Sequence, residues 1–401
     1  MVLPVVWALL AGLALALSWV TGVGAFAWVG YLMLAALGLG AAAGRLGARG
    51  LRASRWLSAD RVSLGGEVEV EVEVENRSRL PALWLYAAET LPAGLSMSGV
   101  RGRVGPLGGG GRFGFRYTLQ GARRGYYQIG PTVLRTGDLF GLSVKERAEA
   151  PAVGLTVFPK IVAIQHARLP SRRSIGDVRA RHRVLEDPVQ VVGIRPYERS
   201  DGMRRVHWRA TAHTGRLQSK LYELSSQVAT ALALNLRRSE YPSHPGEAEE
   251  AGELAIVTAA SVAHHVLDRR QQASLLAAAR DLAATGGDQM VRVGAGRGRE
   301  QLTRILSALG RVSLGQVAPL AAALDREKEA LAWGSLVVVI TPSVGAELLR
   351  VLLNLRTSGF DVTAILVGRG PALAAGRAGL GAVGIRAMSV RSEADIHGLG
   401  L

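Results

Sequence analysis

The residues best suited to acid–base chemistry lie in one stretch, 192–223, which is dense in Arg, His, Trp and Tyr. Asp201, His207 and His213 fall within it, and Asp and His side chains commonly act as paired acids and bases. A nucleophile is missing, because this chain of 401 residues has no cysteine and no Gly-x-Ser-x-Gly elbow. A His-Glu-x-x-His metal motif is absent too. A hydrolase that uses Asp201 and His207 is therefore an alternative hypothesis, and a non-enzymatic protein is the leading one.

Two non-enzymatic interpretations account for the same residues. In the first, the stretch is a structural clasp, in which Asp201 pairs with Arg204 or Arg205. Trp208 then buries its ring and donates its N–H to a carbonyl. In the second, the stretch is a partner-binding surface, because Arg, Trp and Tyr are enriched at interface hot spots. Both interpretations remain open at the level of the sequence.

The charge balance raises the question of nucleic acid. The formal net charge is +16, and the segment 168–220 has thirteen basic and five acidic side chains, a net of +8. Arginines alternate there with Tyr197, Trp208 and Tyr222, a pattern that suits stacking on single strands. No nucleic-acid recognition motif accompanies them. A membrane anchor would also confine the chain to a bilayer surface, so we expect no nucleic-acid partner.

The first 44 residues predict a two-helix transmembrane hairpin. They contain no charged side chain, and one membrane span needs about 20 apolar residues. The run fits spans at 3–20 and 23–43, with Thr21-Gly22 as the turn. Arginines follow at 45, 49, 52 and 55, and the positive-inside rule keeps them in the cytoplasm. We expect a multi-pass protein of the plasma (inner) membrane with cytoplasmic soluble domains and a basic juxtamembrane linker at 45–57.

A β-sandwich domain is predicted at 58–165. Residues 67–75 alternate strictly between Glu and Val, the pattern of a strand with one buried and one solvated face. The stretches 123–131 and 138–142 are typical of turns at sheet corners. Further short strands, separated by Gly or Pro, are expected at 83–86, 112–119 and 126–134.

The last domain, 225–401, alternates apolar runs of strand length with helical patterns. This alternation predicts an α/β domain whose parallel sheet is covered on both faces. A basic signature segment, 166–224, joins it to the sandwich. Strands are expected at 228–236, 273–279, 336–340 and 360–367. Helices are expected at 253–269, 300–309 and 319–331, and a further helix follows 341–344 and ends at about 357.

The long stretch resembles the signature of the domain of unknown function 58 family, roughly Gly-x-Arg-x-Tyr-x-x-Gly-Asp-x-x-Arg-x-Ile-x-Trp followed by Ala-x-Ala-Arg-x-Gly-x-Leu-x-x-Lys-x-x-Glu. Ser200 replaces a glycine of that pattern, and His213 replaces an arginine. A second motif, 124–131 with 138–142, is similar to the family's sheet motif. The signature residues, with His207 among them, are Gly193, Arg195, Tyr197, Asp201, Arg204, Arg205, His207, Trp208, Ala210, Ala212, Gly215, Leu217, Lys220 and Glu223.

The resemblance implies an architecture and a partner. Proteins of this family are similar in having a membrane hairpin, a β-sandwich and a von Willebrand factor A-like, Rossmann-like α/β domain, and many are encoded beside AAA+ ATPases of the MoxR type. The implied function is a membrane-anchored, non-enzymatic scaffold or adaptor that works with such an ATPase in assembly or remodelling of protein complexes. An extracytoplasmic receptor for a ligand or peptide is an alternative, which requires the inverted topology.

The same resemblance points to a metal position that this chain has altered. Active von Willebrand factor A domains hold Mg²⁺ with Asp-x-Ser-x-Ser after the first strand. The corresponding residues here are Asn235, Arg237 and Ser239, and Thr341 follows a later strand where another aspartate is expected. Such a cation needs oxygen ligands with at least one carboxylate, and a guanidinium repels it. We therefore expect a degenerate site with no metal and no cofactor.

Overall fold

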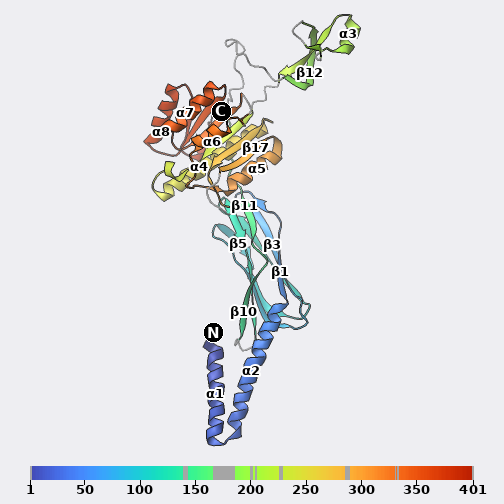
Figure 1. The fold of residues 1–401 in the computed structure, drawn as a ribbon, viewed down its shortest axis with the longest axis vertical. Coiled ribbons are helices and arrows are strands. Elements are labelled where there is room, and N and C mark those ends of the chain that lie inside the picture. The colour runs from blue at the N-terminus through green and yellow to red at the C-terminus, as the bar shows by residue number, and fades with distance from the viewer. Residues whose placement is uncertain are drawn as a thin grey trace. The chain divides into compact units, whose positions relative to one another are not determined.

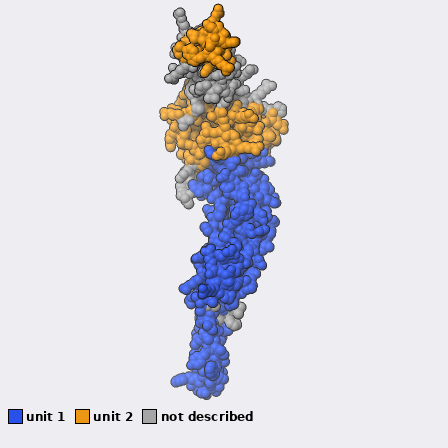
Figure 2. Space-filling view, turned by 90° about the vertical axis from the view of Figure 1, so that its right-hand side faces the viewer, with its two compact units in different colours: residues 1–161, 280–289, 303–313 blue, residues 162–279, 290–302, 314–401 orange. Residues whose placement is uncertain are grey.

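The computed structural model describes residues 2–138, 143–165, 186–198, 202–203, 206–224, 229–284, 290–329, 331 and 334–399. They belong to two compact units, coloured separately in Figure 2. Unit 1 comprises 1–161 with 280–289 and 303–313, and unit 2 comprises 162–279, 290–302 and 314–401. The C-terminal part of the chain therefore contributes two short pieces to unit 1.

Two long apolar helices open the chain (Figure 1). Helix α1 spans Val2–Thr21 and α2 spans Gly24–Arg49, and both are long and apolar enough to cross a membrane. Gly22 makes the turn between them with a φ of 70°, a conformation that favours glycine. The predicted pair of apolar helices is confirmed.

The expected linker at 45–57 is wrong, because both of its halves are regular structure. Helix α2 continues to Arg49, and strand β1 (Leu51–Leu57) begins almost immediately after it. Alternate side chains of β1 are buried or half-buried. One of them is Arg55, whose charge suggests a solvated segment when only the sequence is considered. A buried partner, Glu89, makes its place in the strand possible.

Unit 1 contains the predicted β-sandwich. One sheet has the order β1-β3-β7-β5, a second has β10-β9-β4-β6, and short strands form β2-β11-β8. The four inward valines of β3 (Glu67–Asn76) are fully buried, whereas Glu71 on the outer face pairs with Arg116 at 2.9 Å. The other strands are β2 Arg61–Val62, β4 Ala82–Glu89, β5 Leu95–Gly99, β6 Gly102–Leu107, β7 Arg112–Gly121, β8 Gly125–Ile129, β9 Thr132–Gly137, β10 Val144–Glu149 and β11 Val153–Val157.

The single strand expected at 126–134 is two strands in different sheets. Strand β8 ends at Ile129, and β9 begins at Thr132. Gly130 lies between them with a φ of 96°, which few residues other than glycine adopt. This conformation redirects the chain from one sheet to the other.

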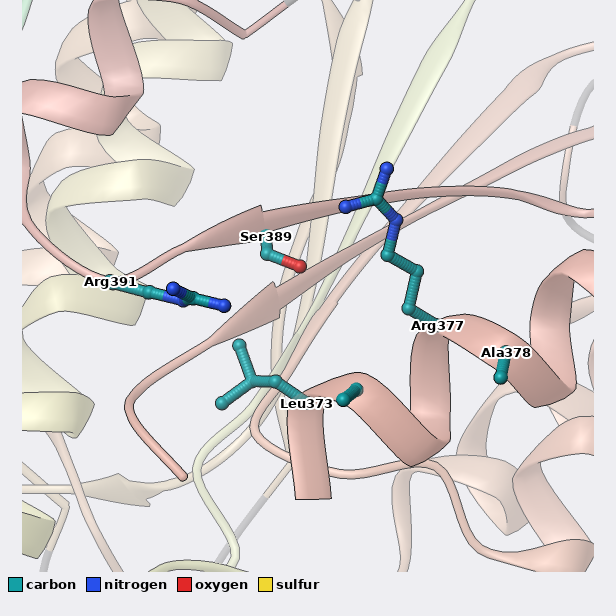
Figure 3. A pocket seen from close by; sticks show the side chains of 6 residues that line it. Leu373, Arg377, Ala378, Ser389 and Arg391 are labelled. Atoms are coloured by element: carbon teal, nitrogen blue, oxygen red, sulfur yellow. The ribbon is translucent and has the colours of Figure 1, made fainter. Parts of the chain in front are cut away.

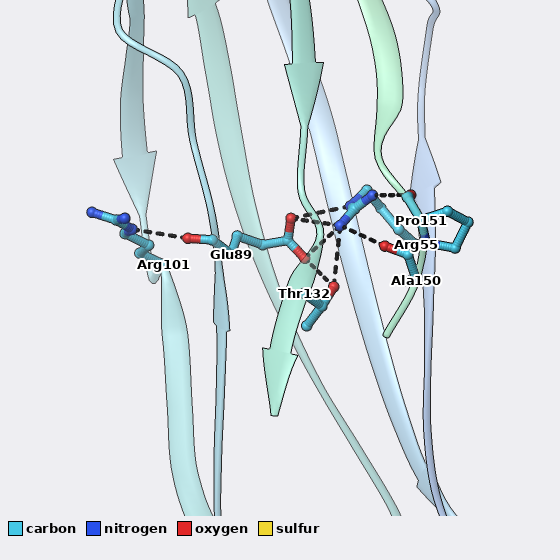
Figure 4. Close-up of polar contacts among 6 residues, drawn as sticks. All are labelled: Arg55, Glu89, Arg101, Thr132, Ala150 and Pro151. Atoms are coloured by element: carbon cyan, nitrogen blue, oxygen red, sulfur yellow. Dashed lines mark hydrogen bonds and ion pairs between the residues drawn. The ribbon is translucent and has the colours of Figure 1, made fainter. Parts of the chain in front are cut away.

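An ion pair lies inside the sandwich, between Arg55 of β1 and Glu89 of β4 (Figure 4). The two charged groups approach to 2.8 Å, and the side chains are 1 % and 0 % exposed. The Arg55 guanidinium also donates to the Thr132 hydroxyl at 3.1 Å and to the Pro151 carbonyl at 2.9 Å. Burial, with the Glu89 carboxylate nearby, raises the pKa of Tyr117. The network supplies the several hydrogen bonds that buried charges require.

Arg124, from the motif expected at a sheet corner, caps a helix end. Helix α5 spans Gly298–Arg311. The Arg124 guanidinium donates to the carbonyls of Leu309, Gly310 and Val312 at 3.0, 3.3 and 2.7 Å. The last carbonyls of a helix lack partners within it and carry partial negative charge. Arg124 therefore ties the end of α5 to the sandwich within unit 1.

We expect Arg124→Ala to destabilise this part of unit 1 by about 1.5–3 kcal/mol, the usual range for hydrogen bonds to charged groups. Arg124→Lys is the control, because an ammonium keeps the charge but lacks the planar fork that reaches three carbonyls together. Hydrogen exchange of 303–313 measures the effect. Equal exchange in the wild type and the alanine variant would contradict the capping role.

Unit 2 contains a six-stranded sheet in the order β17-β15-β14-β19-β20-β21. All neighbours are parallel except β15 and β17. The central strands β14 (Thr230–Asn235) and β19 (Leu336–Thr341) are buried along their whole length. The sheet extends in both directions from the first strand of the domain, as in doubly wound folds. The predicted Rossmann-like, von Willebrand factor A-like domain is confirmed.

Helices α6, α7 and α8 cover the sheet face that carries Val337 and Val339, and α4 contacts β14, β15, β19 and β20. The expected strand at 273–279 is β15, although its alanines are ambiguous in the sequence. The remaining elements are α4 Pro245–Asp268, β15 Ala273–Ala278, β16 Arg280–Asp281, β17 Met290–Gly296, β18 Val312–Ser313, α6 Leu320–Glu327, α7 Ala346–Thr357, β20 Asp361–Val367, α8 Pro371–Ala382, β21 Arg386–Val390 and α9 Glu393–His397.

A pH dependence is expected from His265 on α4. Burial, and then the charge of Arg269, lowers the pKa of its imidazole from 6.5. A group whose pKa is lowered on folding contributes stability that is complete above the unfolded value and is lost as pH falls through the folded value. We expect unit 2 to lose stability below a pH of about 6.5 and His265→Gln to flatten this slope. Urea unfolding of both proteins across this range checks it, and identical slopes would contradict it.

Candidate functional site

The altered metal position lies where β14 and β19 end side by side. The strands pair in parallel with Leu234 opposite Ile340, which makes Asn235 and Thr341 neighbours at the carboxyl edge of the sheet. Both residues are fully buried. Doubly wound sheets bind their ligands beyond this edge. The structure therefore brings together two of the residues that the sequence analysis assigned to one site.

Asn235 is the centre of a hydrogen-bond cluster. Its Nδ2 donates to Glu240 Oε2 at 2.7 Å and to Thr341 Oγ1 at 3.1 Å. Its Oδ1 accepts from the backbone N–H of Arg237 at 3.2 Å. The Thr341 hydroxyl donates in turn to the Ser343 carbonyl at 2.8 Å. Both the nitrogen and the oxygen of the Asn235 side-chain amide are therefore hydrogen-bonded within the protein.

Glu240 supplies a carboxylate that the sequence analysis missed. It ends the short 3-10 helix η2 (Arg238–Glu240) that follows β14, and its Oε1 lies 3.8 Å from a guanidinium nitrogen of Arg237. Beside it, the Tyr241 hydroxyl donates to the Asn235 carbonyl at 2.7 Å. Burial, with the Glu240 carboxylate nearby, raises the pKa of Tyr241. Ser239, in contrast, is exposed.

This set of groups does not fit Mg²⁺. The cation takes oxygen ligands, whereas Asn235 directs its N–H groups at the carboxylate and Arg237 holds a positive charge beside it. The Glu240 and Thr341 oxygens already take part in hydrogen bonds. Within the described ranges no cluster of three or more His, Cys, Asp or Glu side chains could hold a metal. The expectation of no metal stays a prediction for measurement in solution.

The described signature residues form a small motif, which we call the signature module (186–198, 202–203 and 206–224). Strand β12 (Glu186–Pro196) pairs antiparallel with β13 (Gln218–Leu224), and helix α3 (Trp208–Thr214) lies between them in the chain. The register pairs Arg195 with Ser219 and places Gly193 opposite Leu221. Tyr197 continues the pairing, since its N–H donates to the Leu217 carbonyl at 3.0 Å. Lys220 and Glu223 both lie on β13.

Two signature residues define the ends of α3. His207 Nδ1 accepts from the Ala210 N–H at 3.1 Å and caps the first turn. Gly215 has a φ of 67°, and its N–H donates to the Thr211 carbonyl, an arrangement typical of a glycine C-cap. The imidazole of the candidate base His207 is therefore engaged in capping α3. Its proposed partner Asp201 lies outside the described residues, so the hydrolase hypothesis stays a prediction.

The clasp interpretation is wrong for Trp208. Its side chain is 63 % exposed, because α3 buries none of its residues. Met203 at 61 % and Ile194 at 50 % are exposed as well. With Leu217 at 43 %, the motif has four large exposed apolar residues, which is typical of a binding surface. The ion pair expected from Arg204 or Arg205 lies, like these two residues, outside the described part of the chain.

A shallow hollow lies between α8 and β21, the edge strand of the sheet (Figure 3). Arg377 of α8 and Arg391, just after β21, lie on either side of Ser389. The Asp395 carboxylate accepts from the backbone N–H of Arg391 at 2.8 Å, and the charge of Arg391 helps to lower its pKa, whereas no ion pair joins Arg377 to a described carboxylate. The lining groups suit a carboxylate or phosphate, and nothing in the sequence pattern marks them.

Known structures resemble parts of the chain at low identity. A von Willebrand factor type A protein from Catenulispora acidiphila is 14 % identical, with 45 % of this chain and 42 % of that one covered and a TM-score of 0.31. The CARDB domain of a Pyrococcus furiosus protein is 16 % identical, with 27 % and 91 % covered and a TM-score of 0.21. The strand orders given above define the folds independently of these likenesses. No curated protein is similar enough in sequence to count as a relative.

The family comparison agrees with the signature residues. The family model described as "Protein of unknown function DUF58" matches residues 193–371. The match begins at Gly193, the first residue of the signature pattern, and extends through β14 and β19 into the α/β domain. The resemblance is therefore confirmed over residues 193–371, which match the family model and make up less than half of the chain.

Proposed function

We propose that this protein is a membrane-anchored, non-enzymatic scaffold or adaptor that docks a partner through its signature module. The observation that carries the proposal is the exposure of apolar and basic side chains on that module. Trp208 and Met203 are each more than half exposed. Aromatic and arginine side chains of this kind supply most of the binding energy in protein interfaces.

The charge of the module indicates an acidic partner. Arg209, Arg216 and Lys220 have no carboxylate partner among the described residues, and the one described ion pair of the module joins Arg195 to Glu198. Complementary potentials speed association and exclude like-charged surfaces. The family resemblance adds a class of partner, a MoxR-type AAA+ ATPase, and the adaptor would link it to the bilayer.

The soluble units face the cytoplasm in this proposal. Arg45 and Arg49 lie in the last turns of α2, beyond its apolar part, and such residues remain on the cytoplasmic side. Protease treatment of spheroplasts tests the orientation. Cleavage in the sandwich loops from outside the cell would favour an extracytoplasmic receptor instead.

Binding is tested with the full chain in lipid nanodiscs and a purified MoxR-type ATPase. We expect Trp208→Ala to weaken binding by about 30-fold or more, since a hot-spot tryptophan contributes at least ~2 kcal/mol. Trp56→Ala is the matched control, because Trp56 of β1 is 57 % exposed. Equal losses in both variants would contradict docking at the signature module. Crosslinking in native membranes that recovers no AAA+ ATPase would contradict the partner.

A further inference from the structure

Helix α2 is in direct contact with one end of the sandwich. Three of its glycines face that end: a Cβ atom on Gly40 would lie 3.2 Å from Asp138 Cγ, and one on Gly44 would lie 3.0 Å from the Ser143 carbonyl. A Cβ atom on Gly47 would lie 3.8 Å from the Pro81 carbonyl oxygen. The small residues let the helix backbone lie close against the loops. We call this the α2 end of the sandwich (79–83, 138 and 143–145).

The contact leaves no spacer between the apolar helix and the sandwich. Residues 24–39 of α2 precede Gly40, a length of roughly 24 Å at ~1.5 Å per residue. The hydrocarbon core of a bilayer is about 30 Å thick. A helix that spans it therefore brings the α2 end of the sandwich to the membrane surface.

Apolar side chains are exposed at this end. Leu80 is 49 % exposed, Leu83 is 41 % exposed and Val144 is 51 % exposed. Strand β9 pairs with β4 on one side, where Thr136 is opposite Leu85, and with β10 on the other, where Gly137 is opposite Val144, so the start of β4 and the start of β10 lie at the same end of this sheet. These side chains extend the apolar surface of α2 onto the sandwich.

Basic side chains are exposed at the same end. The charged side chains of Arg45, Arg49, Arg79 and Lys145 are exposed, and no ion pair joins any of them to a described carboxylate. The acid at this end, Asp138, is buried. Exposed basic and apolar side chains together are the composition that binds to anionic headgroups.

We propose that the α2 end of the sandwich lies in the headgroup layer of an anionic bilayer, with Leu80, Leu83 and Val144 at its acyl boundary. The sandwich is then a second membrane contact beside the hairpin. This inference rests on the membrane anchoring in the proposed function. Its continuity with the apolar helix favours lipid over a protein partner at this surface.

Single-cysteine variants of the full chain test the proposal, because the chain has no cysteine of its own. Leu83→Cys and Val144→Cys, labelled with an environment-sensitive fluorophore, report on the α2 end. Leu64→Cys is the matched control, since Leu64 is also 41 % exposed and precedes β3, whose other end pairs with the start of β1. Leu13→Cys reports on α1. The probes are vesicles of phosphatidylethanolamine with phosphatidylglycerol, and the same vesicles with phosphatidylcholine in place of the anionic lipid.

We expect the labels at 83 and 144 to be several-fold less quenched by iodide than the label at 64, and to be quenched by headgroup-proximal spin-labelled lipid. Their protection should be greater in the anionic vesicles. If the labels at 83 and 144 are as accessible to iodide as the label at 64 while lipid quenches the label at 13, this inference is overturned and membrane anchoring stands. If lipid does not quench the label at 13, anchoring itself fails. Equal protection in both vesicle types would overturn the role of the cations.

Discussion

Replacing Glu89 by alanine is expected to destabilise the sandwich by about 3–5 kcal/mol, the usual cost of leaving one charge of a buried pair without its partner. The Arg55 guanidinium would stay inside the sandwich with only the hydroxyl of Thr132 and backbone carbonyls as partners. Neutral acceptors do not compensate a buried positive charge. Hydrogen exchange of β1 and β3 in the full chain measures the loss.

An exposed ion pair of the same two residue types provides the control. Arg116 and Glu71 pair at 2.9 Å with side chains 66 % and 43 % exposed, and such pairs contribute about 0–1 kcal/mol. Glu71→Ala should therefore change exchange very little. The double variant Arg55→Met with Glu89→Leu should recover much of the loss, because well-packed apolar residues commonly replace a buried pair without cost. A loss from Glu71→Ala as large as that from Glu89→Ala would refute the role of burial.

The second large effect is expected from Asn235→Asp, which restores the residue type of an active metal site. The introduced carboxylate would replace an N–H donor that lies 2.7 Å from Glu240 Oε2. We expect a loss of about 3 kcal/mol at neutral pH, the upper end for an unsatisfied buried polar group. Repulsion between the two carboxylates raises the folded pKa of the introduced group. Stability should therefore be retained below its unfolded pKa and lost as pH rises, the opposite direction from that expected for His265.

Thermal unfolding with and without Mg²⁺ completes this test. We expect no shift for the wild type, whose site holds N–H donors and the Arg237 guanidinium, and a partial rescue of Asn235→Asp, since a cation offsets paired carboxylates. Ser239→Asp is the control, because it adds the same charge at an exposed position of the same turn. A Mg²⁺-dependent shift in the wild type would show that the site still binds metal.

The regular elements were predictable because the order of apolar and polar residues along each element indicates which of its faces is buried. The alternation of Val and Glu gave β3, and the apolar run at 336–340 gave β19, which ends one residue later at Thr341. Asn235 and Thr341 could be paired from sequence for the same reason, since parallel strands end at one edge. Local periodicity is sufficient where a whole face of an element is buried.

Contacts between distant residues were not predictable in this way. The partner of Arg55 is 34 positions away, and the carbonyls that Arg124 caps are more than 180 positions away. In a basic chain each of these arginines is one among many that could be solvated. Glu240 was missed because the metal motif of active von Willebrand factor A domains corresponds to residues 235–239 here and ends at Ser239. The exposure of Trp208 depends on what packs against α3, which a motif does not specify.

The buried position of Arg55 also has a consequence during biosynthesis. A chain made from its N-terminus exposes this guanidinium to water until Glu89, then Thr132 and finally Pro151 have been synthesised. During that interval it is a free positive charge close behind two apolar helices, available to bias their orientation. Only after Pro151 has emerged can the same side chain complete these contacts and leave water. In the topology proposed above, the order of synthesis would let one arginine contribute first to the orientation of the helices and later to the folded interior.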